Sequence, residues 1–156
     1  NMIQCEQDNP KLGYVGKIKK IDTGIVQTFL ESDFIPIIAP IGYGINSATY
    51  NINGDTAAGA VASSLLADRL LLLTDVIGVK DADEKLIHQL TVEEAKKLID
   101  TGIISAGMIP KVNTSIKAIE HGVRASVIID GRVEHACLLE LFTSHGVGTL
   151  FKKAFD

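Results

Sequence analysis

The sequence has 156 residues, a net charge of −4 and an isoelectric point near 5.5, with 46% hydrophobic and 22% charged residues. Its length favours a single domain that buries a core without disulfide or metal crosslinks, and its acidic balance argues against a nucleic-acid-binding surface. The mean hydropathy of +0.24 is high for a soluble domain and favours a sheet with both faces covered by helices.

The cysteines and the apolar runs bear on where the protein works. Cys5 and Cys137 are far apart in the sequence and form neither a disulfide framework nor a CxxC metal motif. The apolar run at 70–73 ends at Thr74 and Asp75, far short of the roughly 18 residues that a membrane span needs, and no signal-peptide pattern is present. We therefore expect a cytoplasmic protein with reduced thiols, no membrane partner and no metal site.

The first half of the chain alternates between apolar runs and helical patterns. A short β-branched run bounded by proline or glycine predicts a buried strand, and a run of small helix-forming residues predicts a helix that packs closely on a flat surface. In chain order, we expect an extended segment at 13–21, a helix at 23–32, a buried strand at 34–40, a helix at 56–67 and a buried strand at 69–76.

The second half carries clearer signals for helix ends. Thr91 and Glu94 stand in capping-box register, and Gly102 and Gly122 are placed to end helices. We expect a hairpin at 78–90 with its turn at 81–84, helices at 91–102 and 108–122, a buried strand at 125–131, a helix at 135–142 and a strand at 146–151. This alternation predicts an α/β fold, a three-layer sandwich with a mainly parallel central sheet covered by helices on both faces. Ligands of such sheets lie beyond the carboxyl ends of the strands.

The stretch YNINGD, residues 50–55, carries the first candidate site. Asn51, Asn53 and Asp55 stand at every second position, and side chains two apart on an extended backbone point the same way. The three could therefore bind a small polar ligand, or Asp55 could cap the helix that follows, and both can hold at once. A calcium loop is excluded because Ala62 stands where a bidentate glutamate is required.

Two further polar clusters follow expected strands or open expected helices. In TDVIGV (74–79), Gly78 would let the backbone approach a ligand, although an ordinary strand exit explains the cluster equally well. In ISAGMIPK (104–111), the helix start favours anions and Lys111 could reach a phosphate there, although a lone helical lysine is more often a surface residue. The phosphate-loop and dinucleotide motifs are not found in the sequence, and the four histidines have no metal-like spacing.

Six motifs in this chain resemble the C-terminal half of the N-acetylglutamate kinases, in the amino acid kinase family. They cover almost the whole chain in the family's order: LGYVGKI, IPIIAPIG, YNINGDTAA, LLLLTDVIGV, LIDTGIISAGMIPKV and LLELFTSHGVGT. YNINGD followed by GMIPKV is the specific pair. Aspartokinase, uridylate kinase, carbamate kinase and glutamate 5-kinase share the fold but not this pair.

The resemblance implies transfer of the γ-phosphoryl group of MgATP to the side-chain carboxylate of N-acetyl-L-glutamate, in arginine biosynthesis. It implies that Asn51 and Asn53 bind the substrate, that Asp55 organises catalytic lysines, and that Lys111 stabilises charge on the transferring phosphoryl group. The implied nucleotide-binding residues are Thr74, Asp75, Val76, Gly78, Val79, Ile103, Ile104 and Ser105. A carboxylate nucleophile needs no general base, and Mg²⁺ would be bound through the nucleotide.

The chain also departs from the family pattern. The motifs of the family's N-terminal half, including a glycine-rich phosphate loop, a second catalytic lysine and the glycine pair that grips acetylglutamate, are not found here. We therefore expect residues 1–156 to form a single nucleotide-binding domain, inactive alone, of a homo-oligomeric parent. His145 stands where arginine-inhibited members carry an acidic residue, which makes arginine control doubtful. The alternatives are a non-catalytic effector- or partner-binding module and a kinase for another carboxylate substrate.

Overall fold

The computed structural model describes residues 2–45, 47–143 and 146–154. The chain divides into two compact units, residues 1–65 and 66–156, each with its own four-stranded sheet. The predicted single domain over 1–156 stays a prediction, because two compact units can belong to one domain. Each unit is described by itself below.

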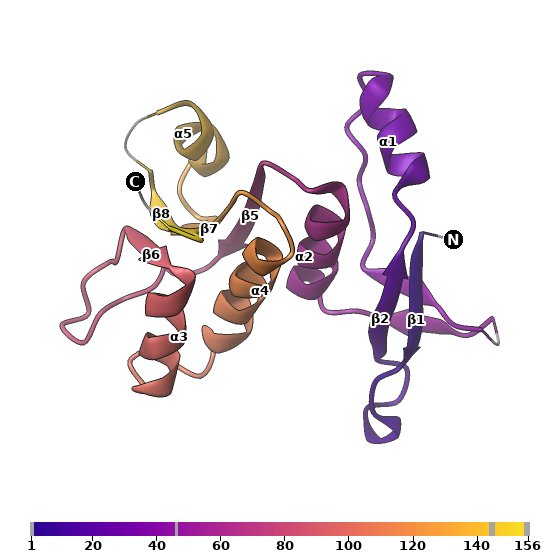
Figure 1. The fold of residues 1–156 in the computed structure, drawn as a ribbon, viewed down its shortest axis with the longest axis horizontal. Coiled ribbons are helices and arrows are strands. Elements are labelled where there is room, and N and C mark those ends of the chain that lie inside the picture. Colours follow the sequence, from indigo (N-terminus) through magenta and orange to yellow (C-terminus); the bar gives the residue numbers. More distant parts are fainter. Residues whose placement is uncertain (1, 46, 144–145, 155–156) are drawn as a thin grey trace. The chain divides into compact units, whose positions relative to one another are not determined.

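The first unit is built on the sheet β2-β1-β3-β4 (Figure 1). Ile3, Cys5, Ile52 and Ala57 form its buried core, against which Ile38 and other half-buried residues pack. β1 pairs antiparallel with β2 and parallel with β3, and β3 pairs antiparallel with β4. The elements are β1 (Ile3–Gln7), a 3-10 turn (Pro10–Leu12), β2 (Gly16–Ile21), α1 (Gly24–Glu31), β3 (Ile41–Tyr43), β4 (Thr49–Asn51) and α2 (Gly54–Leu65). The predicted helices of this half are confirmed, whereas the sequence predicts neither β1 nor β4.

The predicted buried strand at 34–40 is wrong. This segment has no regular secondary structure, and the strand in this region, β3, begins at Ile41. Two prolines, Pro36 and Pro40, remove backbone donors that a paired strand would use. Neighbouring residues of the segment nevertheless differ in burial: Ile35 and Ile37 are 91% and 97% exposed, whereas Ile38 packs against the core. One side of the segment is therefore covered and the other is open.

The second unit is built on the sheet β5-β7-β8-β6. All six residues of β7 are buried, and their side chains alternate between two covered faces. Val127 and Ile129 pack with Ala136 of α5 on one face, while the Ser126 hydroxyl donates to Ser115 of α4, 2.9 Å away, on the other. Figure 1 likewise shows α5 opposite α3 and α4 across this sheet. The elements are β5 (Arg69–Thr74), β6 (Gln89–Thr91), α3 (Val92–Asp100), α4 (Ile109–Glu120), β7 (Ala125–Asp130), α5 (Ala136–Phe142) and β8 (Gly148–Lys152).

The predicted helix ends of this unit are confirmed, whereas the strand pairing differs from the prediction. The reciprocal capping box of Thr91 and Glu94 is formed, and Gly102 and Gly122 adopt positive φ just past their helices. β5 and β7 pair parallel, β7 and β8 antiparallel, and β6 and β8 parallel. Both sheets are thus mixed, in place of one mainly parallel sheet. None of the helices within the described ranges is long and apolar enough to cross a membrane.

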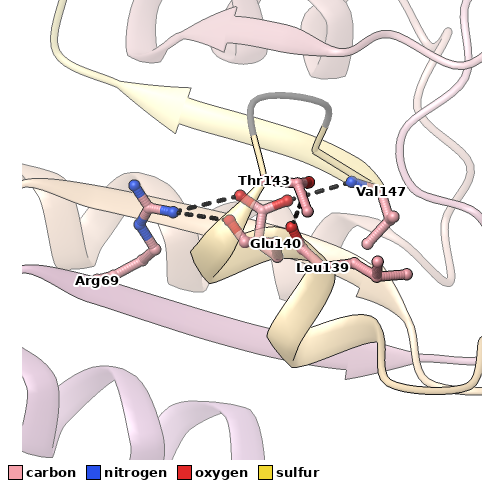
Figure 2. A network of polar contacts seen from close by, with 5 residues as sticks. All are labelled: Arg69, Leu139, Glu140, Thr143 and Val147. Atoms are coloured by element: carbon pink, nitrogen blue, oxygen red, sulfur yellow. Dashed lines mark hydrogen bonds and ion pairs between the residues drawn. The ribbon is translucent and has the colours of Figure 1, made fainter.

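A buried carboxylate ties three elements of the second unit together (Figure 2). Glu140 on α5 is only 6% exposed in its side chain and lies 3.5 Å from the Arg69 guanidinium at the start of β5. Arg69 also donates to the main-chain oxygen of Glu140, and the other carboxylate oxygen accepts from the Val147 amide just before β8. The Thr143 hydroxyl donates to the Leu139 carbonyl and helps to end α5. This network anchors α5 over the sheet.

Candidate functional site

A hollow of about 350 Å³ lies in the second unit, within the size range of small-molecule sites. Three segments form its walls: the loop after β5, the hairpin at 80–86, and the turn that leads into α4. Its lining residues are Thr74, Asp75, Val76, Gly78, Val79, Lys80, Asp81, Glu84, Ile103, Ile104, Ser105, Gly107, Met108 and Lys111. All eight residues predicted to bind nucleotide, and Lys111, therefore line one hollow.

The loop after β5 is held in a shape that only glycine permits at one point. Gly78 has a φ of +135°, and a Cβ atom there would lie 2.7 Å from both the Thr149 hydroxyl and the Leu86 side chain. Immediately after it, the buried Val79 amide donates to the Thr149 hydroxyl at 2.8 Å. Thr149 is itself fully buried on β8. Its hydrogen bond with Val79 therefore connects the loop after β5 to the sheet.

The second wall is the predicted hairpin, which is confirmed by an antiparallel bridge between Lys80 and Leu86. The Asp81 carboxylate shapes its tip by accepting from the backbone amides of Asp83 and Lys85, each at 2.9 Å. Lys80 forms a 2.8 Å ion pair with Glu84 on the same wall. The predicted turn at 81–84 therefore also forms part of the hollow: Asp81 and Glu84 of the turn and the preceding Lys80 line it.

The third wall is the turn before α4, where buried Ile104 and Met108 supply apolar surface. The Ile109 amide at the helix start donates to the Ser105 carbonyl, 3.2 Å away, and Pro110 has no amide proton. Few backbone donors at this helix start are therefore available to an anion. Lys111, the third residue of α4, is half-buried and lines the hollow, so the positive charge at this end comes mainly from its side chain.

The walls combine apolar surface with a small number of charges. Val79, Ile104 and Met108 line the hollow with apolar surface, and Lys111 adds a positive charge. Within the described residues, no group of three or more His, Cys, Asp or Glu side chains could hold a metal ion.

Some lining residues were missed by the sequence analysis. The sequence marks Asp81 and Glu84 as parts of a turn and Lys80 as the residue before it, but no local pattern predicts that the turn borders the hollow. Met108 belongs to the GMIPK motif and has a helix-start position that gives no sign of its burial. Gly107, also in this motif, lines the hollow. Thr149 is far along the chain, and its role depends on a strand pairing that sequence patterns do not specify.

The YNINGD residues lie in the first unit, and their geometry corrects two predictions. β4 ends at Asn51 and α2 begins at Gly54, so Asp55 does not share an extended backbone with the two asparagines. Asn51 and Asn53 are exposed on either side of buried Ile52, as the alternation predicts. The helix is capped by Asn53, whose carboxamide oxygen accepts from the Thr56 amide at 3.0 Å, while half-buried Asp55 lies inside the first turn. His145 lies outside the described residues.

Comparisons with known proteins agree with this fold. The model of the amino acid kinase family matches residues 1–130. Acetylglutamate kinase of Dinoroseobacter shibae is 52% identical over 153 residues, which are 98% of this chain and 53% of that protein. The chain therefore spans about half the length of the curated relatives that it matches.

Two solved structures show how widely the fold is used. N-acetylglutamate synthase from Neisseria gonorrhoeae, complexed with coenzyme A and L-arginine, superposes with a TM-score of 0.91 at 29% identity, over 99% of this chain and 37% of that one. Carbamate kinase from Giardia lamblia bound to AMP-PNP superposes with a TM-score of 0.72 at 22% identity, over 90% of this chain and 47% of that one. The second likeness is one of fold alone.

Proposed function

The chain belongs to the amino acid kinase family, and from that premise we propose that it is part of an acetylglutamate kinase whose residues 74–111 bind MgATP. The observation that carries the proposal is the convergence of all eight expected nucleotide-binding residues and Lys111 on one hollow. The 52% identity to an acetylglutamate kinase supports the choice of reaction.

In the proposed reaction, the γ-phosphoryl group of MgATP passes to the side-chain carboxylate of N-acetyl-L-glutamate. Phosphoryl transfer needs alignment and positive charge around the moving oxygens more than covalent help. Lys111 would stabilise the transferring group from its place on the third wall. Asn51 and Asn53 would bind the acetylglutamate, and Asp55 would hold catalytic lysines in place; these three roles stay predictions.

We expect no measurable kinase activity from the 156 residues alone. The glycine-rich phosphate loop and the second lysine expected of the family are not found in this sequence, and each lost electrostatic contact costs on the order of 10²–10³ in rate. A robust acetylglutamate-dependent release of ADP by this chain would contradict this expectation. The cytoplasmic location and the homo-oligomeric parent likewise stay predictions.

One observation favours a second candidate, a non-catalytic module that binds a small effector. The structure with a TM-score of 0.91 is a synthase, complexed with coenzyme A and L-arginine. The same fold therefore occurs in a protein that is named for a different reaction and was solved with small molecules bound. The fold by itself does not require kinase activity. Lys111 beside the hollow favours the kinase reading, because an effector module has no need of a catalytic cation.

The test is a calorimetric titration of the purified chain with MgADP and MgATP. Lys111→Ala is the test variant, and Lys117→Ala is its control, because Lys117 is an exposed lysine farther along the same helix. We expect binding by the unmodified chain, a loss of about tenfold or more in ATP affinity for Lys111→Ala, and little change for Lys117→Ala. A folded chain that binds neither nucleotide at millimolar concentration would contradict the proposal.

A further inference from the structure

We propose that Arg132 sets the affinity of the hollow for polyphosphate by neutralising two carboxylates, Asp75 and Asp130, at the carboxyl ends of β5 and β7. This inference rests on the proposed nucleotide site and concerns residues that the sequence analysis did not single out as a group. Arg132 itself does not line the hollow, so it would act through its charge beside the wall that Asp75 forms.

The backbone places these residues at the edge of the hollow. Thr74 and Asp130 are register partners at the ends of the parallel strands β5 and β7. The Gly131 amide then donates to the Thr74 carbonyl at 2.8 Å, which fastens the loop after β7 to the start of the loop after β5. Thr74 and Asp75 both line the hollow. Arg132 directly follows Gly131, whose amide is bonded to this wall of the hollow.

Asp130 holds Arg132 firmly. Its carboxylate accepts from Nε of Arg132 at 2.9 Å and from Nη2 at 2.8 Å, and also from the Arg132 backbone amide at 3.0 Å. This fork geometry is the strong form of an arginine–carboxylate pair. The hydrogen bonds lower the pKa of Asp130 to about 2, so the carboxylate is charged at neutral pH. Its side chain is only 7% exposed, whereas that of Arg132 is 66% exposed.

Asp75 is the second carboxylate that acts on this guanidinium. The hydrogen bonds and charge of Asp130, and then the charge of Asp75, raise the pKa of Arg132 above its ordinary value. Asp75 is exposed on the wall of the hollow and accepts from the Thr74 hydroxyl at 3.3 Å. Removal of Arg132 would therefore take the positive charge away from two carboxylates, of which Asp75 lines the hollow.

This arrangement predicts a loss of affinity that grows with ligand charge. The energy of one added negative charge is proportional to the charge of the approaching nucleotide. For Arg132→Gln, measured without Mg²⁺ at low salt, we expect about a twofold to threefold loss for AMP and about tenfold for ATP, with ADP between them. The differences should shrink at 0.5 M salt, where charges more than a few ångströms apart are screened.

The control is Arg124→Gln, which makes the same change of net charge elsewhere in the second unit, where Arg124 pairs with exposed Asp68. The double variant Asp130→Asn/Arg132→Gln removes one of the two carboxylates and should recover part of the ATP affinity. Fluorescence titration with the three nucleotides, on variants shown to be folded by circular dichroism, gives the affinities.

Each outcome decides a different question. A graded loss for Arg132→Gln with recovery in the double variant supports the inference. An equal loss for AMP, ADP and ATP, no loss at all, or the same graded loss for Arg124→Gln overturns it and leaves the proposed site standing. A wild-type chain that binds none of the three nucleotides without Mg²⁺ overturns this inference, and one that also binds neither MgADP nor MgATP overturns the proposed function.

Discussion

At the scale of single residues, Thr149 stabilises the second unit through one buried hydrogen bond. Its buried hydroxyl accepts from the Val79 amide at 2.8 Å, and no solvent reaches either group. Thr149→Val keeps the shape but leaves that amide without its acceptor, so we expect a loss of about 1–3 kcal/mol in the free energy of unfolding. Urea denaturation of the full chain and of its variant measures this loss in the free energy of unfolding.

Thr149→Ser is the matched control, because it keeps the hydroxyl and removes one methyl group. We expect it to cost less than about 1.5 kcal/mol, as for deletion of a single buried methyl. If Thr149→Val cost less than about 0.5 kcal/mol, or less than Thr149→Ser, the hydrogen bond to Val79 would not be the main contribution of this side chain.

At the residue scale, the family motifs predict which residues lie together. Residues that the resemblance implies for nucleotide binding, such as Asp75 and Ser105, line one hollow, and their binding of nucleotide stays a prediction. Propensity allows Asp55 as the cap of α2, as one of two open interpretations, yet Asn53 makes the cap. Aspartate and asparagine are nearly equal as caps, so only the position at which the helix begins could decide between them.

At the scale of elements, the extended segment 34–40 has one packed side and one open side. Ile38 packs against the core of the first unit, whereas Ile37 is 97% exposed. We expect Ile38→Ala to lower the free energy of unfolding by about 1 kcal/mol or more, because it empties packed volume. Ile37→Ala should stay within about 0.5 kcal/mol of the unmodified chain, as surface substitutions do.

The pair of variants is its own control, since the same side-chain atoms are removed at neighbouring positions. Equal losses in urea denaturation would show that Ile37 is covered in solution, by self-association or otherwise. Light scattering on the same samples would distinguish those cases, because self-association raises the measured mass.

The contrast between two elements shows what sequence patterns can decide. The helix from Val92 was predicted with its capping box because every contact that defines the box lies within four residues. The strand at 34–40 was predicted from the same kind of local pattern and is wrong, because a strand exists only where a partner supplies hydrogen bonds. Nothing within residues 34–40 specifies that partner.

At the scale of the whole molecule, the class of fold was predictable and the strand order was not. Alternating strands and helices predict α/β structure. The packing of α5 on one face of β7 and of α4 on the other agrees with this prediction. The mixed pairing depends on contacts between distant segments, such as β6 with β8. Periodicity reports which faces of an element are apolar and carries no information about which element lies beside it.

The two compact units should also differ in stability. In the second unit, Val127, Ile128, Ile129 and Phe151 are fully buried, whereas the first unit has about 65 residues, a size at which a core is marginal. Because amides exchange through local openings, we expect β1 and β2 amides to exchange at least about tenfold faster than β7 amides after correction for intrinsic rates, which corresponds to about 1.4 kcal/mol. Hydrogen exchange with mass spectrometry measures both sets in one sample, and the β5 amides serve as a reference within the second unit. Equal protection in β1 and β7, lost together in urea, would show that the chain unfolds as a single cooperative body.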